Sequence, residues 1–246
     1  MRKVLAVVLV AAGTLVAQDP VDARGWLDRG VQAFKRGQYQ AAATAFERAV
    51  QADPSLLAAQ LYLGTAYMQM YIPGAASPEN QRVAASAHAA FQKVLGMDAG
   101  NVVAMTSDAS LYLNEKNWDA AQAGYEKLTA IQPNNADHYY SLGFIAWSRW
   151  YPSYSKARQD AGMQPADPGP IPDAAIRRQL KTRWDRVLQD GLTAMDRALA
   201  IRPDYADAMA YENLLIRERA DLRDTKEEWQ ADVRVADQWV QKALDL

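Results

Sequence analysis

The chain has 246 residues, of which 50% are hydrophobic and 23% are charged, the balance of a folded protein rather than a disordered one. Its 27 basic and 29 acidic residues give a net charge of −2, too even to favour nucleic acid or an anionic membrane surface as a partner. The absence of cysteine excludes disulfides, thiolate catalysis and zinc–cysteine sites, and two histidines leave little for a metal centre. We therefore expect no cofactor.

The N-terminal segment has the pattern of a secretory signal peptide. Arg2 and Lys3 form its charged region, residues 4–17 are nearly all apolar or small, and Ala17 precedes the expected cleavage point. The apolar stretch is short for a bilayer span, which needs about 20 residues, although an uncleaved anchor is the alternative. We expect residues 1–17 to be removed and the rest to be periplasmic or secreted, with no membrane span after cleavage.

Residues 23–54 are predicted to form two amphipathic helices, about 23–36 after an Asp22 cap and about 39–52, joined by a turn. The defining positions are Trp26, Gly30, Gly37, Tyr39, Ala42, Phe46, Ala49 and Pro54. Gly30 is small where the helices would cross, and Phe46 would fill the space between them. This spacing closely resembles a tetratricopeptide repeat (TPR). One hairpin cannot bury its own apolar face, so the resemblance implies further copies stacked into an all-α, right-handed superhelix, or α-solenoid.

Two further hairpins are predicted between residues 55 and 134. The repeat at 55–99 is expected to begin with a Ser55 cap and to carry an insertion at 71–81, which contains helix-stopping prolines. The repeat at 101–134 has no insertion, but Asp108 and Ala109 replace the leucine and glycine that are usual in the family. These segments extend the array of hairpins.

The fourth repeat, 135–203, contains a longer proline-rich insertion at 151–173. After it, apolar residues recur every three or four positions and predict one continuous helix over 174–201. A degenerate terminal helical pair, 204–246, closes a solenoid domain that spans 22–246. Its charged segment 217–224 is expected to be a solvated helix end, and its last helix is expected to bury Trp229, Val233, Ala236, Trp239 and Ala243. All prolines are expected to lie outside helix interiors.

The resemblance implies a ligand groove on the concave face, lined by the first helix of each hairpin. Carried over position by position, the groove residues are Leu27, Phe34, Lys35, Leu61, Thr65, Met68, Gln69, Ser110, Leu113, Asn114, Tyr140, Phe144, Trp147 and Arg217. Most are apolar or neutral, which favours an extended peptide or an amphipathic helix as the ligand. The basic clamp of chaperone-binding TPR domains is not visible, since Leu27, Val31 and Thr65 occupy comparable places.

Other candidate sites have structural explanations. The aromatic cluster Trp147, Trp150, Tyr151 and Tyr154 could be a binding hot spot, but we favour packing against the following loop and Trp184. His88 and His138 show no metal-ligand spacing and are expected to be surface or packing residues. The pairs Glu227–Glu228 and Asp204–Asp207 lie at predicted helix starts, where carboxylates stabilise the helix dipole.

The sequence therefore predicts a non-catalytic TPR scaffold that binds a protein or peptide in the bacterial cell envelope. The two insertions would supply specificity, because loops of repeat arrays often bind ligands. Two alternatives stay open: a helical-toroid enzyme that processes glycans, and a solenoid that assembles with itself through its open ends.

Overall fold

The computed structural model describes residues 22–246, and all regular secondary structure in this range is helical. The helices are α1 (Ala23–Lys35), α2 (Tyr39–Ala52), α3 (Leu57–Met70), α4 (Pro78–Met97), α5 (Val102–Asn114), α6 (Trp118–Ile131), α7 (Ala136–Asp160), α8 (Ala174–Ile201), α9 (Ala206–Ala220) and α10 (Lys226–Leu244). From residue 22 onward, none of them is both long and apolar enough to cross a membrane. The predicted signal peptide, residues 1–17, lies outside the described residues.

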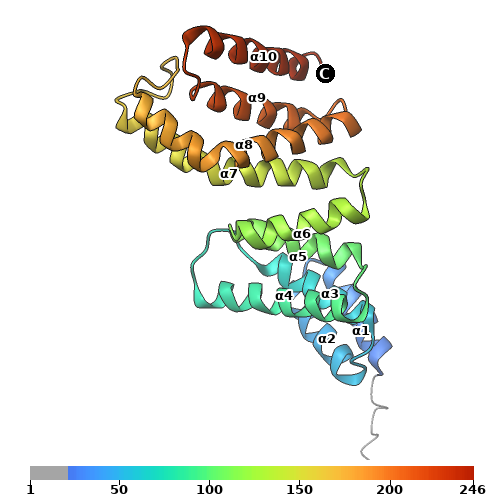
Figure 1. The fold of residues 1–246 in the computed structure, drawn as a ribbon. Helices are drawn as coiled ribbons and strands as arrows, with labels where there is room; N and C mark the ends of the chain where they lie inside the picture. The colour runs from blue at the N-terminus through green and yellow to red at the C-terminus, as the bar shows by residue number, and fades with distance from the viewer. Residues whose placement is uncertain (1–21) are drawn as a thin grey trace, which may run out of the picture.

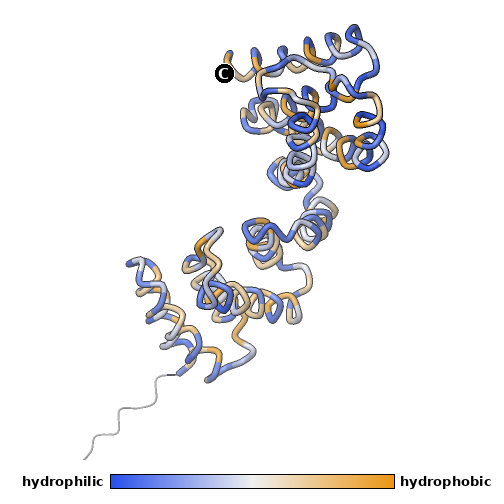
Figure 2. Tube along the Cα trace, turned by 90° about the vertical axis from the view of Figure 1, so that its left-hand side faces the viewer, coloured by the Kyte–Doolittle hydropathy of each residue, from blue (hydrophilic) through white to orange (hydrophobic). Residues whose placement is uncertain are grey.

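The helices pack in consecutive pairs that stack into one solenoid (Figure 1). Each helix packs mainly against its neighbours in the chain, and the pairs α1/α3, α3/α5 and α7/α9 add contacts between the first helices of successive hairpins. Hydrophilic and hydrophobic residues alternate along the helices (Figure 2), as in helices that bury one face. The predicted all-α solenoid is confirmed.

Close helix crossings define the first four hairpins. In each, one residue is small because a side chain on the facing helix fills its space; the pairs are Gly30/Phe46, Gly64/Phe91, Gly124/Ala109 and Gly143/Met195. In the third hairpin the small residue has moved to the second helix, where a Cβ on Gly124 would lie 2.8 Å from the Ala109 Cβ. Gly124 therefore compensates for the alanine that departs from the family pattern.

The first insertion is shorter than predicted, because α4 begins early. Ser77 caps α4 and Pro78 occupies its first turn, where no backbone N–H is needed, so only residues 71–77 form the loop. The buried Asn80 amide bonds to both backbone groups of Ile72 at 2.8 and 2.9 Å and to the Ala75 carbonyl at 2.9 Å. This side chain fixes the loop to the helix that follows it.

The second insertion is also shorter than predicted, since α7 continues through Pro152 to Asp160 and leaves residues 161–173 as the loop. α7 and α8 form the most extensive helix pair (Figure 1), and Trp150 is fully buried with its ring centroid 6.0 Å from that of Trp184. This packing outweighs the backbone hydrogen bond lost at Pro152. The expectation that no proline lies inside a helix is wrong, whereas α8 has the predicted bounds.

Predictions at other helix ends had mixed outcomes. Ser55 is not a cap: it bonds to Asp53, and α3 begins two residues later with no side-chain cap. The last helix, α10, begins with a capping box between Thr225 and Glu228. Of its predicted buried face, only Ala236 is fully buried, because no further helix in the described chain covers α10.

Candidate interaction surface

A strip of aromatic rings runs along α7 and onto α9. Tyr140, Phe144, Trp147 and Tyr151 recur at steps of three or four residues and so share one face of α7. Tyr211 of α9 packs edge-on against the middle of this row, with its ring centroid 5.2 Å from those of Phe144 and Trp147. We call these five residues the aromatic strip. Tyr151 is 43% exposed and the others are half-buried, which leaves aromatic surface open to a partner.

A buried carboxylate lies beneath this strip. The indole N–H of Trp147 donates to Oε1 of Glu218 at 3.0 Å, and Glu218 is only 4% exposed. Its Oε2 and the Trp150 Nε1 are also buried, and the Trp150 indole lies close enough to Glu218 to lower the pKa of the carboxyl, although no well-aligned hydrogen bond joins Oε2 to the described residues. Burial raises the pKa of Glu218 to about 7, and the charge of Asp221 adds to this shift. The carboxyl group therefore titrates near neutral pH.

Asp221 ties the second insertion to the end of α9. Its carboxylate accepts hydrogen bonds from Tyr154 Oη at 2.9 Å, from Trp229 Nε1 at 2.9 Å and from the guanidinium of Arg158. Its backbone carbonyl accepts from the N–H of Ile171 at 3.0 Å. The segment 217–224 is therefore not a solvated helix end as predicted, because the extended α7 and the following loop cover two of its acids, Glu218 and Asp221.

A cavity of about 600 Å³ lies beside the C-terminal end of the strip. Its walls include Tyr151 and Tyr154 of α7, Met163 of the loop, and Arg217 and Glu218 of α9. We call this cavity the tyrosine pocket. It combines aromatic walls with a buried carboxyl group, a composition typical of a ligand-binding pocket.

The loop over this pocket is held by Arg158. Its guanidinium donates to the carbonyl of Gln164 at 3.0 Å and to that of Asp167 at 2.6 Å, in addition to the ion pair with Asp221. The side chain of Asp167 also accepts from the N–H of Gln164 at 2.7 Å. The second insertion is therefore an ordered wall of the pocket.

The structure brings Tyr140, Phe144, Trp147 and Arg217 of the predicted groove to this region. The other predicted residues lie on α1, α3 and α5. Five of them are partly buried in the hydrophobic clusters of the first three hairpins: Leu27, Phe34, Leu61, Met68 and Leu113. Thr65 bonds to the Leu61 carbonyl and Ser110 to the Tyr125 hydroxyl, each at 2.9 Å, while three polar residues are exposed: Lys35, Gln69 and Asn114. Ligand binding by these residues stays a prediction.

Sequence reasoning missed the buried acids of α9. Glu212 and Glu218 share one face of α9 with Ala208 and Leu215, at steps of four, three and three residues. This register, rather than the alternating charges of the segment, is the signal that predicts burial. Burial also raises the pKa of Glu212, to about 8, with Asp196 adding to the shift.

Tyr205 and Tyr211 were not singled out either, because their role depends on contact with α7. Tyr205 lies 5.1 Å from Tyr140 between ring centroids, and its hydroxyl donates to Asp137 at 2.9 Å. Burial and this hydrogen bond raise the pKa of Tyr205. Tyr205 thus supports the N-terminal end of the strip.

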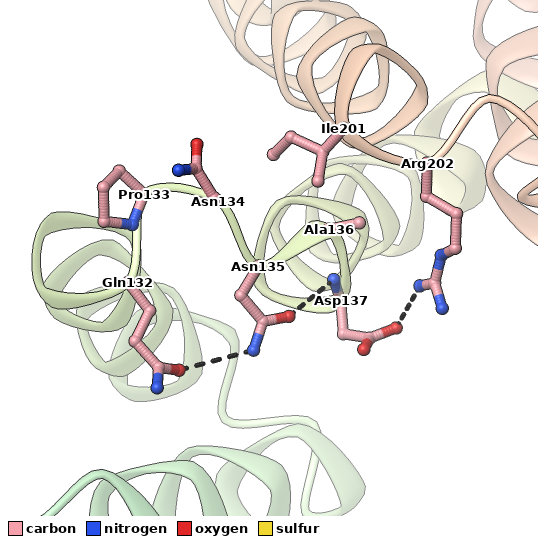
Figure 3. Close-up of a pocket in the computed structure, with 8 residues that line it drawn as sticks. All are labelled: Gln132, Pro133, Asn134, Asn135, Ala136, Asp137, Ile201 and Arg202. Carbon is pink, nitrogen blue, oxygen red and sulfur yellow. Dashed lines mark hydrogen bonds and ion pairs between the residues drawn. The ribbon is translucent and has the colours of Figure 1, made fainter.

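Another cavity, of about 590 Å³, lies where α6 meets α7 (Figure 3). The polar side chains that line it bond to one another: Asn135 donates to Gln132 at 3.3 Å and caps Asp137 at 3.1 Å, and Arg202 pairs with Asp137. Most of these polar groups bond to one another, although Arg202 Nε has no partner in the described chain, and we interpret them as fixing the turn between α6 and α7.

His88 connects the second and third hairpins. Its Nδ1 lies 2.5 Å from Asp108 Oδ1 and its Nε2 lies 2.8 Å from Glu115 Oε2, while its ring stacks on Tyr112 with a centroid distance of 3.9 Å. Burial disfavours the charged ring, but the hydrogen bonds to the two carboxylates outweigh burial and raise the pKa of His88. Asp108 thus replaces a leucine with a polar contact between repeats.

The other histidine, His138, is buried and contacts Gln132 Oε1 at 2.9 Å; burial lowers its pKa. In the described range, no three acidic or histidine side chains converge as metal ligands would.

The geometry defines a helical-repeat scaffold, and a known family matches its N-terminal part. The tetratricopeptide-repeat family model matches residues 10–56 and 27–102. No curated protein sequence matches the chain. The matched residues, 10–102, are less than half of the chain, so the match assigns TPR repeats to the first hairpins, and the remaining hairpins share the helical-repeat fold. TPR arrays are protein-interaction scaffolds.

Solved structures extend the likeness over most of the chain. A crystal structure of MamA protein is 18% identical with a TM-score of 0.60, and covers 91% of this chain and 90% of that one. MamA 41-end from Desulfovibrio magneticus RS-1 is 16% identical with a TM-score of 0.60, and covers 91% and 94%. At this identity the likeness concerns the fold alone.

Proposed function

We propose that this chain is an exported, non-catalytic bacterial TPR scaffold that binds a segment of another protein along the aromatic strip. The observation that carries the proposal is the strip itself, in which five rings touch one another and remain partly exposed on a repeat scaffold. Tyrosine and tryptophan are enriched at interface hot spots, since they bury large areas and lose little rotamer entropy.

The length of the strip sets the size of the ligand. From Tyr140 to Tyr151 the helix rises by about 16 Å, at about 1.5 Å per residue. An extended peptide covers that distance with about five residues, at about 3.3 Å each, and a helix does so with about three turns. An extended peptide would place alternate side chains between the rings, and a helix would place side chains four residues apart there.

The non-catalytic part of the proposal is supported by the positions of the candidate carboxylates. Glu228 is used in the capping box, and Glu227, Asp204 and Asp207 are exposed at helix starts. Glu218 lines the tyrosine pocket, but its acidic neighbour Asp221 already accepts three donors. Glycan hydrolysis normally needs two carboxylates available to the substrate. Release of sugars from envelope glycans by the purified chain would contradict the proposal.

Export and a monomeric state belong to the same proposal. Residues 1–17 have the signal-peptide pattern, so N-terminal sequencing of the protein from cell fractions should find Gln18 first in the periplasm or medium. An intact Met1 terminus on a membrane-bound protein would favour the anchor instead. Light scattering at high micromolar concentration should give a monomer, and concentration-dependent growth would favour self-assembly.

A capture experiment tests the binding surface. Purified chain should retain a specific protein from envelope extract, and the double variant Phe144→Ala, Tyr151→Ala should lose it. Ile131→Ala is the matched control, because Ile131 is 47% exposed and lies on α6, which contributes no residue to the strip. Equal retention by all three proteins would place the partner elsewhere, provided that circular dichroism shows equal helix content.

A further inference from the structure

The tyrosine pocket contains a buried acidic side chain that plays no part in the proposed binding along the aromatic strip. Its wall includes Glu218, which is more than nine-tenths buried and has one carboxylate oxygen, Oε2, with no well-aligned hydrogen bond in the described chain, although the Trp150 indole lies near. A buried acceptor left unpaired costs free energy unless a ligand completes it. The nearby Asp221 is ion-paired with Arg158, so Glu218 is the acid of this pocket that a positively charged ligand group would pair with.

The two arginines of the pocket are already paired. Arg158 bonds to Asp221 and to two loop carbonyls. Arg217 donates from Nε to Asn213 at 2.8 Å and pairs with Asp237 of α10. Their charges are therefore compensated by neighbouring groups, whereas the carboxyl of Glu218 has no cationic partner within residues 22–246.

The walls of the pocket suit the stem of a cationic side chain. Tyr151 and Tyr154 line it with rings whose centroids lie 6.4 Å apart. Aromatic faces attract ammonium groups, and methylene stems pack well against them. The loop wall contributes Met163, a flexible apolar side chain.

We propose that the tyrosine pocket binds an alkylammonium group, the side chain of a lysine on the protein segment that occupies the aromatic strip. Its methylene stem lies along Tyr151 and Tyr154, and its ammonium group donates to Oε2 of Glu218. The assignment of this lysine to a bound protein rests on the proposed function, while the preference for ammonium is a property of the pocket.

The test uses small probes that need no partner protein. The full chain, labelled with ¹⁵N, is titrated with n-butylammonium chloride or with n-butanol, its neutral counterpart, at matched ionic strength. The indole N–H signal of Trp147, assigned by comparison with Trp147→Phe, reports on the site because this group bonds to Glu218. We expect saturable shifts and an affinity for n-butylammonium about fivefold or more above that for n-butanol.

Two variants decide the chemistry. Glu218→Gln keeps the shape and removes the charge, so it should lower the affinity for n-butylammonium about fivefold or more and leave n-butanol binding unchanged. Tyr151→Leu should also weaken ammonium binding selectively, and Glu227→Gln on the exposed start of α10 is the control. Equal affinity for the two probes, or ammonium binding that survives Glu218→Gln, would overturn the proposal. Loss of capture by the strip variants does not affect this outcome, so the two proposals fail separately.

Discussion

The buried carboxyl of Glu218 makes the stability of the C-terminal hairpins depend on pH. Its pKa is about 7 in the folded chain, against 4.5 for an ordinary glutamate. Below pH 4.5 both states hold the proton, so the group has no effect on folding relative to a neutral side chain. Between pH 4.5 and 7 the unfolded chain releases the proton while the folded chain keeps it, and stability falls as pH rises. Above pH 7 the loss is complete.

The size of this loss follows from the shift. About 2.5 pH units at about 1.4 kcal/mol each give roughly 3 kcal/mol as an upper limit. Glu218→Gln is neutral at every pH and nearly the same shape. It should therefore match the wild type near pH 4.5 and be more stable by about 2–3 kcal/mol at pH 8.5.

Urea unfolding followed by tryptophan fluorescence at several pH values measures this difference. The difference between variant and wild type is the informative quantity, because Glu212 shifts in the same direction and affects both proteins equally. Glu227→Gln, at an exposed carboxylate, should leave the curve unchanged. A Glu218→Gln protein that is equally or less stable than the wild type at pH 8.5 would refute the argument that this acid is buried without a cationic partner.

Three further changes test the fold. Gly30→Ala should destabilise the chain by about 1–3 kcal/mol because its Cβ would overlap a ring, whereas Gly96→Ala, with open space around it, should raise stability by about 0.5 kcal/mol; thermal melts distinguish the two. Gly124→Ala should lower the free energy of unfolding by about 1–3 kcal/mol, and adding Ala109→Gly should restore at least half of that loss. A smaller recovery would contradict the close contact of these two residues at one helix crossing. The carboxylate partners of His88 raise its pKa, so its contribution to stability is complete below pH 6.5 and is lost as pH rises through the folded pKa. In urea titrations at several pH values, His88→Asn should remove this part of the pH dependence of stability. An unchanged pH dependence would contradict the ion pair.

The features that could be predicted from the sequence are those set by local periodicity. The bounds of α8 follow from an apolar repeat at helical spacing, and the first hairpin follows from the positions of Gly30 and Phe46. The α7 extension could not be predicted this way, because Pro152 is a local stop signal and the packing that overrides it comes from α8, more than 20 residues later. Tertiary contact decides such cases.

In the candidate interaction surface, too, local pattern predicted some features, while others depended on tertiary contacts. The packing interpretation of Trp150 is confirmed by its contact with Trp184, but Tyr151, one residue on, is 43% exposed. Which aromatic residues of α7 are buried and which stay exposed depends on the helices that pack against it, α8 and α9. The charges of 217–224 looked solvated in isolation, whereas Glu218 lies in register with the apolar face of α9.

Site-specific photo-crosslinking in living cells tests the central claim most directly. A photoreactive phenylalanine is placed at Tyr151 in the strip or at Ile131 on α6, two positions of similar exposure. The account predicts a discrete covalent adduct with another protein from position 151 that is absent from position 131 and is lost when Phe144→Ala is added. Adducts of equal yield from both positions, or from position 131 alone, would contradict the claim that the aromatic strip is the binding surface.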